Sequence, residues 1–151
     1  MPFSIDPQYL NVPSPPLTTE VDKSMIRRFA TALGLTNPIY LQEDYARGQG
    51  YASLVAPPTF AVTLPHAPIP GLVLPESGIL HGEQQFEYEH QIIAGDRITV
   101  RAWVEGVRKR KGSQGTMNIV TIAQDAKNQL DLITVRSRAV LIVVTDAEEE
   151  A

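Results

Sequence analysis

Apolar residues recur at three- and four-residue spacing in one early stretch of the chain. This pattern is typical of an amphipathic helix with one buried stripe, formed here by Val21, Met25, Ile26, Phe29, Ala32 and Leu33. We expect Thr18 or Thr19 to cap this helix and Gly34 to end it. A shorter helix is expected from about Leu41 to Arg47.

After Gly78 the pattern becomes an alternation of apolar and polar residues, which predicts strands. The expected strands cover about 79–91, 97–109, 115–126 and 130–144 and would form an antiparallel meander. Val140 to Val144 is continuously apolar, so we expect this part to be buried on both faces. Helices followed by strands predict an α+β domain with helix packed on one face of a sheet.

Prolines and charge divide the chain into parts. Residues 1–17 hold five prolines, which exclude a regular helix and predict an extended arm. Pro58 suits the first turn of a buried helix running to about Leu64. Residues 145–151 predict an acidic, solvated tail. One domain would therefore span residues 18–144.

Composition narrows the classes of function. A formal net charge of -4 argues against binding to the phosphate backbone of nucleic acids. The chain has no cysteine, so it has no disulfide framework and no thiolate nucleophile. It shows neither a signal-peptide pattern nor an apolar run of roughly 18 residues, so we expect a soluble cytoplasmic protein without a membrane partner. No motif for a metal or for a cofactor is present, and we expect none of either.

A few charged residues leave alternatives open. The cluster from Arg108 to Lys111 fits a solvated hairpin tip, or a landing site for the phosphates of coenzyme A or for an acidic carrier protein. Glu83 and Glu87 alternate onto one strand face, which would meet solvent or a subunit interface. His81, at an expected strand start, is the imidazole most worth testing, although a lone histidine in a strand is usually structural.

Three stretches, taken in order, carry a resemblance to a known family. They are Asn37-Pro38-Ile39-Tyr40, the segment from Gly50 to Phe60 that contains Val-Ala-Pro-Pro-Thr-Phe, and the segment from His81 to Asp96. Together they resemble the N-terminal domain of MaoC-like dehydratases, from about Thr18 to Val144. The resemblance implies a hot-dog fold, in which a curved antiparallel sheet wraps around a central helix and two such units lie side by side. It also implies acyl-CoA or acyl carrier protein thioesters as ligands.

The departures from this family concern its catalytic residues. The first stretch is similar to the G-D-x-N-P-(I/L)-H loop of (R)-specific enoyl-CoA hydratases, whose Asp and His handle the water and the proton. Leu35 and Tyr40 occupy those two positions here. Leu35 cannot act as a base, and a tyrosine with an ordinary pKa of about 10 accepts a proton poorly at neutral pH. Pro57 and Pro58 stand where catalytic relatives tend to place His-Gly, so a backbone oxyanion donor would come from Thr59 or Phe60.

The resemblance therefore implies a subunit of a hydro-lyase that lacks its own catalytic pair. The chain would bind the acyl thioester in a (3R)-hydroxyacyl dehydratase or enoyl hydratase, and a partner hot-dog subunit would supply Asp and His. The substrate-binding residues that the resemblance implies are Asn37, Tyr40, Tyr51, Pro58, Thr59 and Phe60. One alternative is a non-catalytic homodimeric module that binds acyl-CoA or another small ligand. A second is a hot-dog thioesterase in which Glu43, Asp44 or Glu83 activates water.

Overall fold

A five-stranded antiparallel sheet organises the chain, which a computed structural model describes over residues 2–113 and 115–145. Its strands, in spatial order, are β2 (Leu17–Glu20), β5 (Arg97–Gly112), β6 (Gly115–Lys127), β7 (Ile133–Thr145) and β4 (Ile79–Tyr88). β1 (Ser4–Ile5) and β3 (Leu72–Val73) form a separate two-stranded pair. The predicted acidic tail lies outside the described residues except for Thr145, which ends β7.

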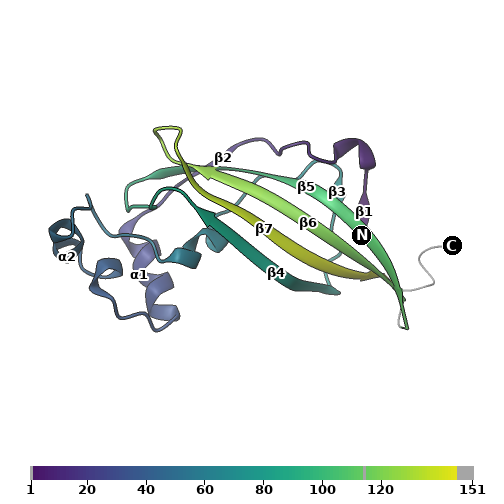
Figure 1. Ribbon diagram of the computed structural model, residues 1–151, viewed down its shortest axis with the longest axis horizontal. Coiled ribbons are helices and arrows are strands. Elements are labelled where there is room, and N and C mark those ends of the chain that lie inside the picture. Colours follow the sequence, from purple (N-terminus) through teal and green to yellow (C-terminus); the bar gives the residue numbers. More distant parts are fainter. Residues whose placement is uncertain (1, 114, 146–151) are drawn as a thin grey trace.

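The helices gather at one end of this sheet, and the β5–β6 hairpin lies at the other end (Figure 1). α1 covers Lys23–Ala32 and α2 covers Glu43–Gly48. Three 3-10 helices complete the list: η1 (Pro7–Tyr9), η2 (Pro38–Tyr40) and η3 (Pro58–Thr63). The expected cap of α1 was wrong. Thr18 and Thr19 pair with β5 as part of β2, and the Asp22 side chain caps the helix by accepting a hydrogen bond from Met25 N at 2.8 Å.

The expected meander holds for β5, β6 and β7 but is wrong for β4. β4 pairs with β7, as in the register of Tyr88 with Val135, and the chain then crosses to β5 on the far side of β6. Alternation along a strand identifies the strand and its faces, but it does not name the neighbouring strand. This crossover makes β4 an edge strand.

The central element is shorter than the helix expected from Pro58 to Leu64. It is the six-residue 3-10 helix η3, which follows Pro57. Phe60 of η3 is 1% exposed, and its ring meets Phe29 of α1 edge to face at a centroid distance of 5.6 Å. The sheet curves around this element, so the chain has the α+β hot-dog fold that the sequence predicted.

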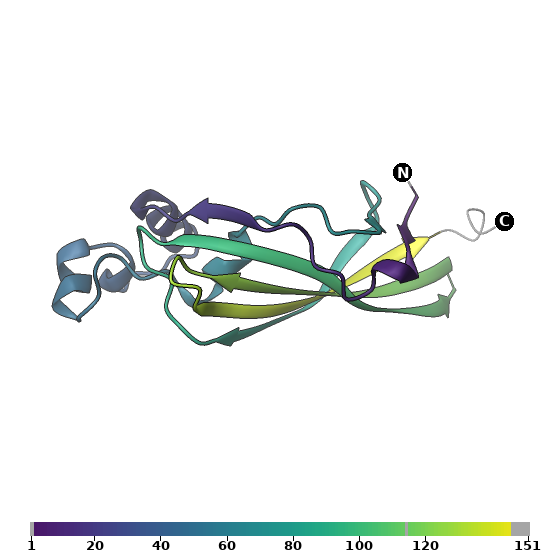
Figure 2. The ribbon, with the colours of Figure 1, turned by 90° about the horizontal axis from the view of Figure 1, so that it is seen from above.

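The two faces of the sheet differ in their cover, and we call them the inner and the outer face. On the inner face, Ile98, Val100 and Val135 pack with α1 and η3, and a second cluster of strand residues packs with β1, β3 and the arm. Figure 2 shows the arm, in purple, on one side of the sheet. No described element covers the outer face.

This arrangement corrects the prediction for the last strand. Val143 points to the inner face and is 0% exposed, whereas Val140, Ile142 and Val144 point to the outer face and are only half-buried. Continuous apolar character in β7 does not mean burial on both faces.

The two edges of the sheet also differ. Along β5, the edge beyond β2 is covered by the arm, where Asn11 N donates to Val104 O and Ser14 N donates to Ala102 O, each at 2.8 Å. The buried Ser14 hydroxyl also accepts a hydrogen bond from Ala102 N at 3.1 Å. β4 pairs only with β7 among the described residues, so its other edge is open.

Candidate functional site

The loop that resembles a catalytic loop is held by local structure. Gly34, with a φ of +69°, ends α1, and Leu35 N donates to Ala30 O at 2.9 Å. The Asn37 side chain then caps η2 by accepting a hydrogen bond from Ile39 N at 3.1 Å. Tyr40, the last residue of η2, packs against the core cluster beside α1 and η3. The loop therefore holds Leu35 and Tyr40 at these two positions, and the Leu35 side chain has no ionisable group.

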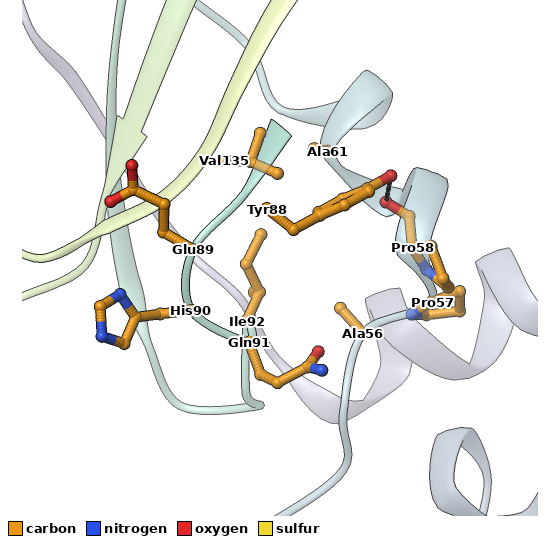
Figure 3. Close-up of a pocket in the computed structure, with 10 residues that line it drawn as sticks. All are labelled: Ala56, Pro57, Pro58, Ala61, Tyr88, Glu89, His90, Gln91, Ile92 and Val135. Atoms are coloured by element: carbon orange, nitrogen blue, oxygen red, sulfur yellow. Dashed lines mark hydrogen bonds between the residues drawn. The ribbon is translucent and has the colours of Figure 1, made fainter. Parts of the chain in front are cut away.

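A cavity of about 370 Å³ lies between the start of η3 and the end of β4 (Figure 3). Its lining residues are Ala56, Pro57, Pro58, Ala61, Tyr88, Glu89, His90, Gln91, Ile92 and Val135. The Tyr88 hydroxyl donates to Pro58 O at 2.6 Å across this cavity. Burial raises the pKa of Tyr88, so its hydroxyl stays protonated and remains a donor at neutral pH.

Glu89 and His90 belong to this lining but point away from the proline pair in Figure 3. Glu89 forms an ion pair with Arg136, and His90 Nδ1 lies 2.9 Å from Ile133 O. Both polar groups are therefore held by residues of β7. What the cavity offers near Pro58 is mainly apolar surface.

The two amides expected as oxyanion donors differ in their surroundings. Phe60 N donates to Pro57 O at 2.9 Å in the first turn of η3. Thr59 lies in the same first turn, where helical N–H groups have no partner within the helix, and its side chain is exposed. Pro57 and Pro58 carry no N–H, and the Phe60 N–H is already bonded to Pro57 O. An oxyanion at this turn would therefore have to accept its hydrogen bond from the Thr59 N–H.

A second cavity of about 500 Å³ lies at the other end of η3, against the inner face of the sheet. Its lining is Val62, Thr63, Leu64, Pro65, His66, His81, Gln84, Ile122, Gln124, Ser137 and Ala139. The structure thus brings His66 and His81 to one groove, which the sequence analysis did not foresee. Gln84 and Gln124 were also missed. Their polar side chains at inner-face positions of β4 and β6 were the signal that could have revealed this groove.

The six residues that the resemblance implied for substrate binding do not line one cavity. Pro58 lines the first cavity, while Phe60 borders a shallow surface hollow shared with Met25, Arg28 and Phe29. Four of the six, Asn37, Tyr40, Tyr51 and Thr59, line neither of the two cavities. Their proposed contact with a substrate remains a prediction.

The carboxylates named for a thioesterase differ in their surroundings. Glu43 pairs with Lys23 and with Arg47, and Ser53 lies within hydrogen-bond distance. The hydrogen bond from Lys23 is the main cause that lowers the pKa of Glu43, which makes this carboxylate a weaker base. Asp44 is exposed on α2, and Glu83 lies on β4 with its side chain toward the outer face.

Neither a metal site nor a membrane-spanning helix is found within the described part of the chain. No group of three or more His, Asp or Glu residues in it could hold a metal ion. None of its helices has both the length and the apolar character needed to cross a membrane.

Comparison with known proteins gives consistent results. Residues 11–135 match the family model described as FAS1-like, dehydratase domain region. A Streptomyces griseus protein designated UPF0336 is 34% identical over 156 aligned residues, which cover 99% of this chain and 100% of that protein.

Two solved structures from Mycobacterium tuberculosis have similar folds. A chain of the ChsH1-ChsH2 complex has a TM-score of 0.72 at 19% identity, and the matched region covers 90% of this chain and 86% of that chain. A chain of the C-terminally truncated HadBC complex, a 3R-hydroxyacyl-ACP dehydratase, has a TM-score of 0.67 at 22% identity. The matched region covers 83% of this chain and 90% of that chain. The family match covers most of the chain and the solved structures share its hot-dog fold, so the chain belongs to the family described as FAS1-like, dehydratase domain region.

Proposed function

We propose that this chain is the acyl-thioester-binding subunit of a (3R)-hydroxyacyl dehydratase or enoyl hydratase, and that a second hot-dog subunit supplies the catalytic Asp and His. The loop around η2 carries this proposal. It keeps the Asn-Pro turn of the family, with Asn37 capping η2, but holds Leu35 and Tyr40 at the two catalytic positions. A chain that keeps the fold and lacks the base fits a binding role better than a catalytic one.

The two cavities support the proposal that this chain binds the acyl thioester. They lie at opposite ends of η3, one beside Pro57 and Pro58 and the other beside Val62 to His66. η3 is a single short 3-10 element, so it covers less of the inner face than a longer helix would. We assign the thioester end of the ligand to the first cavity, near the Thr59 amide, and the acyl chain to the second.

The open edge of β4 supports the proposal of a second hot-dog subunit. A ten-residue edge strand without proline presents unpaired backbone N–H and C=O groups, which readily accept another strand. The similar folds in the ChsH1-ChsH2 and HadBC complexes belong to assemblies of two differently named chains. We therefore assign the catalytic hot-dog subunit to the β4 edge.

Hydration of a short enoyl-CoA, followed by the loss of absorbance of the conjugated thioester, tests this proposal. We expect no turnover by this chain alone and turnover when it is co-purified with a hot-dog chain that keeps the Asp–His loop. Replacing the partner's loop aspartate by asparagine should abolish the activity. Turnover by this chain alone would contradict the proposal, whereas acyl-CoA binding without activity in any assembly would favour a non-catalytic binding module.

A substitution in this chain tests the acyl site within the active assembly. Ala139 lines the second cavity and Val140, the next residue, points to the outer face. We expect Ala139→Phe to lower turnover of long-chain enoyl thioesters more than that of short ones, because the added ring fills the groove. The matched variant Val140→Phe should leave the chain-length profile unchanged. Equal profiles for both variants would place the acyl chain elsewhere.

A further inference from the structure

The outer face of the sheet carries a continuous aliphatic patch, which we call the outer patch. Its members are Leu80, Met117, Ile119, Val140, Ile142 and Val144. Ile142 of β7 lies directly beside Ile119 of β6 and Leu80 of β4 in the strand register, so the patch crosses three strands without a gap. Leu80 is 60% exposed, and no element of residues 2–113 and 115–145 lies over the patch. Such a face is typical of an interaction surface.

A glycine keeps this patch open. β4 has a bulge between His81 and Glu83, and Gly82 occupies it. A Cβ atom at Gly82 would come within 3.2 Å of Ile142 Cδ1, in the centre of the patch. Glycine at this position therefore leaves the Ile142 side chain free to meet another surface.

Opposite charges border the outer patch on its two sides. On the β5 side, Arg108 and Arg110 lie beside Ile119 and Met117 in the register. On the β4 side, Glu83 lies beside Val140. These three charged residues are exposed, and none forms an ion pair with another described residue. Further along the sheet, beyond the row that holds the Arg138–Glu105 ion pair, Arg101 of β5 and Glu87 of β4 stand at the two ends of a row that Asp125 and Arg136 complete.

We propose that the outer patch is the contact surface for a second copy of this chain, packed face to face with a two-fold axis parallel to the strands. This axis places β5 of one copy over β4 of the other, so that Arg108 and Arg110 meet Glu83 and the aliphatic centres meet each other. An axis across the strands would instead place cations over cations. Aligned sheets pack in this way about 10 Å apart in β-sandwiches.

The proposed contact does not depend on the proposed function. Face-to-face packing uses side chains of the outer face, whereas strand addition uses the backbone edge of β4. A hot-dog partner and a second copy can therefore bind the same chain together. The chain's own residues 146–151 do not suit the patch, because they are acidic residues and alanines and bring no large apolar side chain.

The first test compares the molar masses of the wild type and Ile142→Asp by light scattering during gel filtration. A buried aspartate in the centre of the interface is costly to desolvate, so we expect the mass of the variant to be half that of the wild type. Retained far-UV circular dichroism shows that the variant is folded. Equal masses for the two folded proteins would overturn the proposal, whatever contact the β4 edge makes.

The second test identifies the occupant as another copy in the stated orientation. Glu83→Arg and Arg108→Glu, each made alone, place like charges against each other and should weaken association at least tenfold. The double variant restores opposite charges at the same places, so it should recover most of the wild-type affinity. Failure of the double variant to recover would overturn the second-copy assignment. Neither the molar mass nor the association affinity depends on hydratase activity, so this proposal and the proposed function can fail separately.

Discussion

The inner and outer faces of the sheet are formed by alternating residues of the same strands, yet within residues 2–113 and 115–145 other elements cover only the inner face. Val143 and Ile142 are sequence neighbours in β7. Val143 is 0% exposed in the cluster formed with β1, β3 and the arm, whereas Ile142 is half-buried among other outer-face side chains. The apolar character of β7 is the same on both sides, but the surroundings are different.

This difference separates two contributions of apolar residues. Hydrophobic free energy depends on the apolar area that is removed from water. Inner-face contacts are complete in the folded chain, so substitutions there should lower its free energy of unfolding. Outer-face contacts become complete only when another molecule covers them, so substitutions there should act mainly on association. The largest effect is therefore expected in the layer of the inner cover next to the sheet, and smaller effects on the outer face and in the layers further out.

Phe60, in the innermost layer, should give the largest effect. It is 1% exposed and packs edge to face on Phe29, so Phe60→Ala removes most of a buried ring and leaves a cavity. We expect the free energy of unfolding to fall by about 3–5 kcal/mol, measured by urea denaturation.

Ile119→Ala is the matched substitution on the outer face. Under dilute conditions that favour the single chain, we expect it to lower the free energy of unfolding by less than about 1 kcal/mol, because the side chain is already partly hydrated. A loss as large as that of Phe60→Ala would mean that the outer face is covered within the chain, and the contrast between the faces would not hold.

Tyr88 joins the edge strand β4 to the inner cover. Its hydroxyl donates to Pro58 O at 2.6 Å, so Tyr88→Phe leaves this carbonyl without that donor and should lower the free energy of unfolding by about 1 kcal/mol. Thermal unfolding followed by circular dichroism measures the effect. Tyr45→Phe on exposed α2 is the control and should change the melting temperature very little. Equal stability of Tyr88→Phe and the wild type would show that the hydrogen bond does not hold η3.

Asn37 belongs to a layer further out, in the loop around η2. Its side chain, itself exposed, caps a single half-buried 3-10 turn, so Asn37→Ala should lower the free energy of unfolding by about 0.5 kcal/mol, the low end for such caps. Asn37→Asp keeps an oxygen acceptor and should retain most of the stability. A larger loss in Asn37→Asp than in Asn37→Ala would point to another role for the amide.

Much of this fold follows from local pattern. The helix at residues 23–32 and the strands β4 to β7 were predicted to within a few residues, because periodicity reports directly which residues face a core. The local character of turns also fits Asp96, which follows Gly95 and whose carboxylate accepts a hydrogen bond from Ile93 N at 2.9 Å. Pairing of β4 with β7 could not be read in this way, because it depends on long-range packing.

The candidate site was less predictable than the fold. The resemblance located Pro58, but it did not reveal that Tyr88 would reach Pro58 O or that His66 and His81 would line one groove. These contacts join residues that are 15 to 30 positions apart and depend on how η3 sits on the sheet. Burial of β7 on both faces was wrongly expected for a related reason. Periodicity shows that a side chain is apolar, but it does not show which molecule covers it.

Glu43 lies in the outermost layer and should give the smallest and most pH-dependent effect. It connects α2 to α1 through Lys23 and pairs with Arg47 within α2. Its pKa in the folded chain is lowered from an ordinary value of 4.5, mainly by the hydrogen bond from Lys23. The stabilisation from its charge is therefore complete above pH 4.5 and is lost as the pH falls through the lowered folded pKa.

Glu43→Gln should accordingly lower the melting temperature slightly at neutral pH and have no effect well below pH 4.5. The measurement is the melting temperature of both proteins over a pH series at low ionic strength, because added salt screens such exposed pairs. Asp44→Asn, which removes the adjacent carboxylate, is the control, since Asp44 forms no ion pair with a described residue. A difference between wild type and Glu43→Gln that persists unchanged into acid would mean that the glutamate acts through packing and not through its charge.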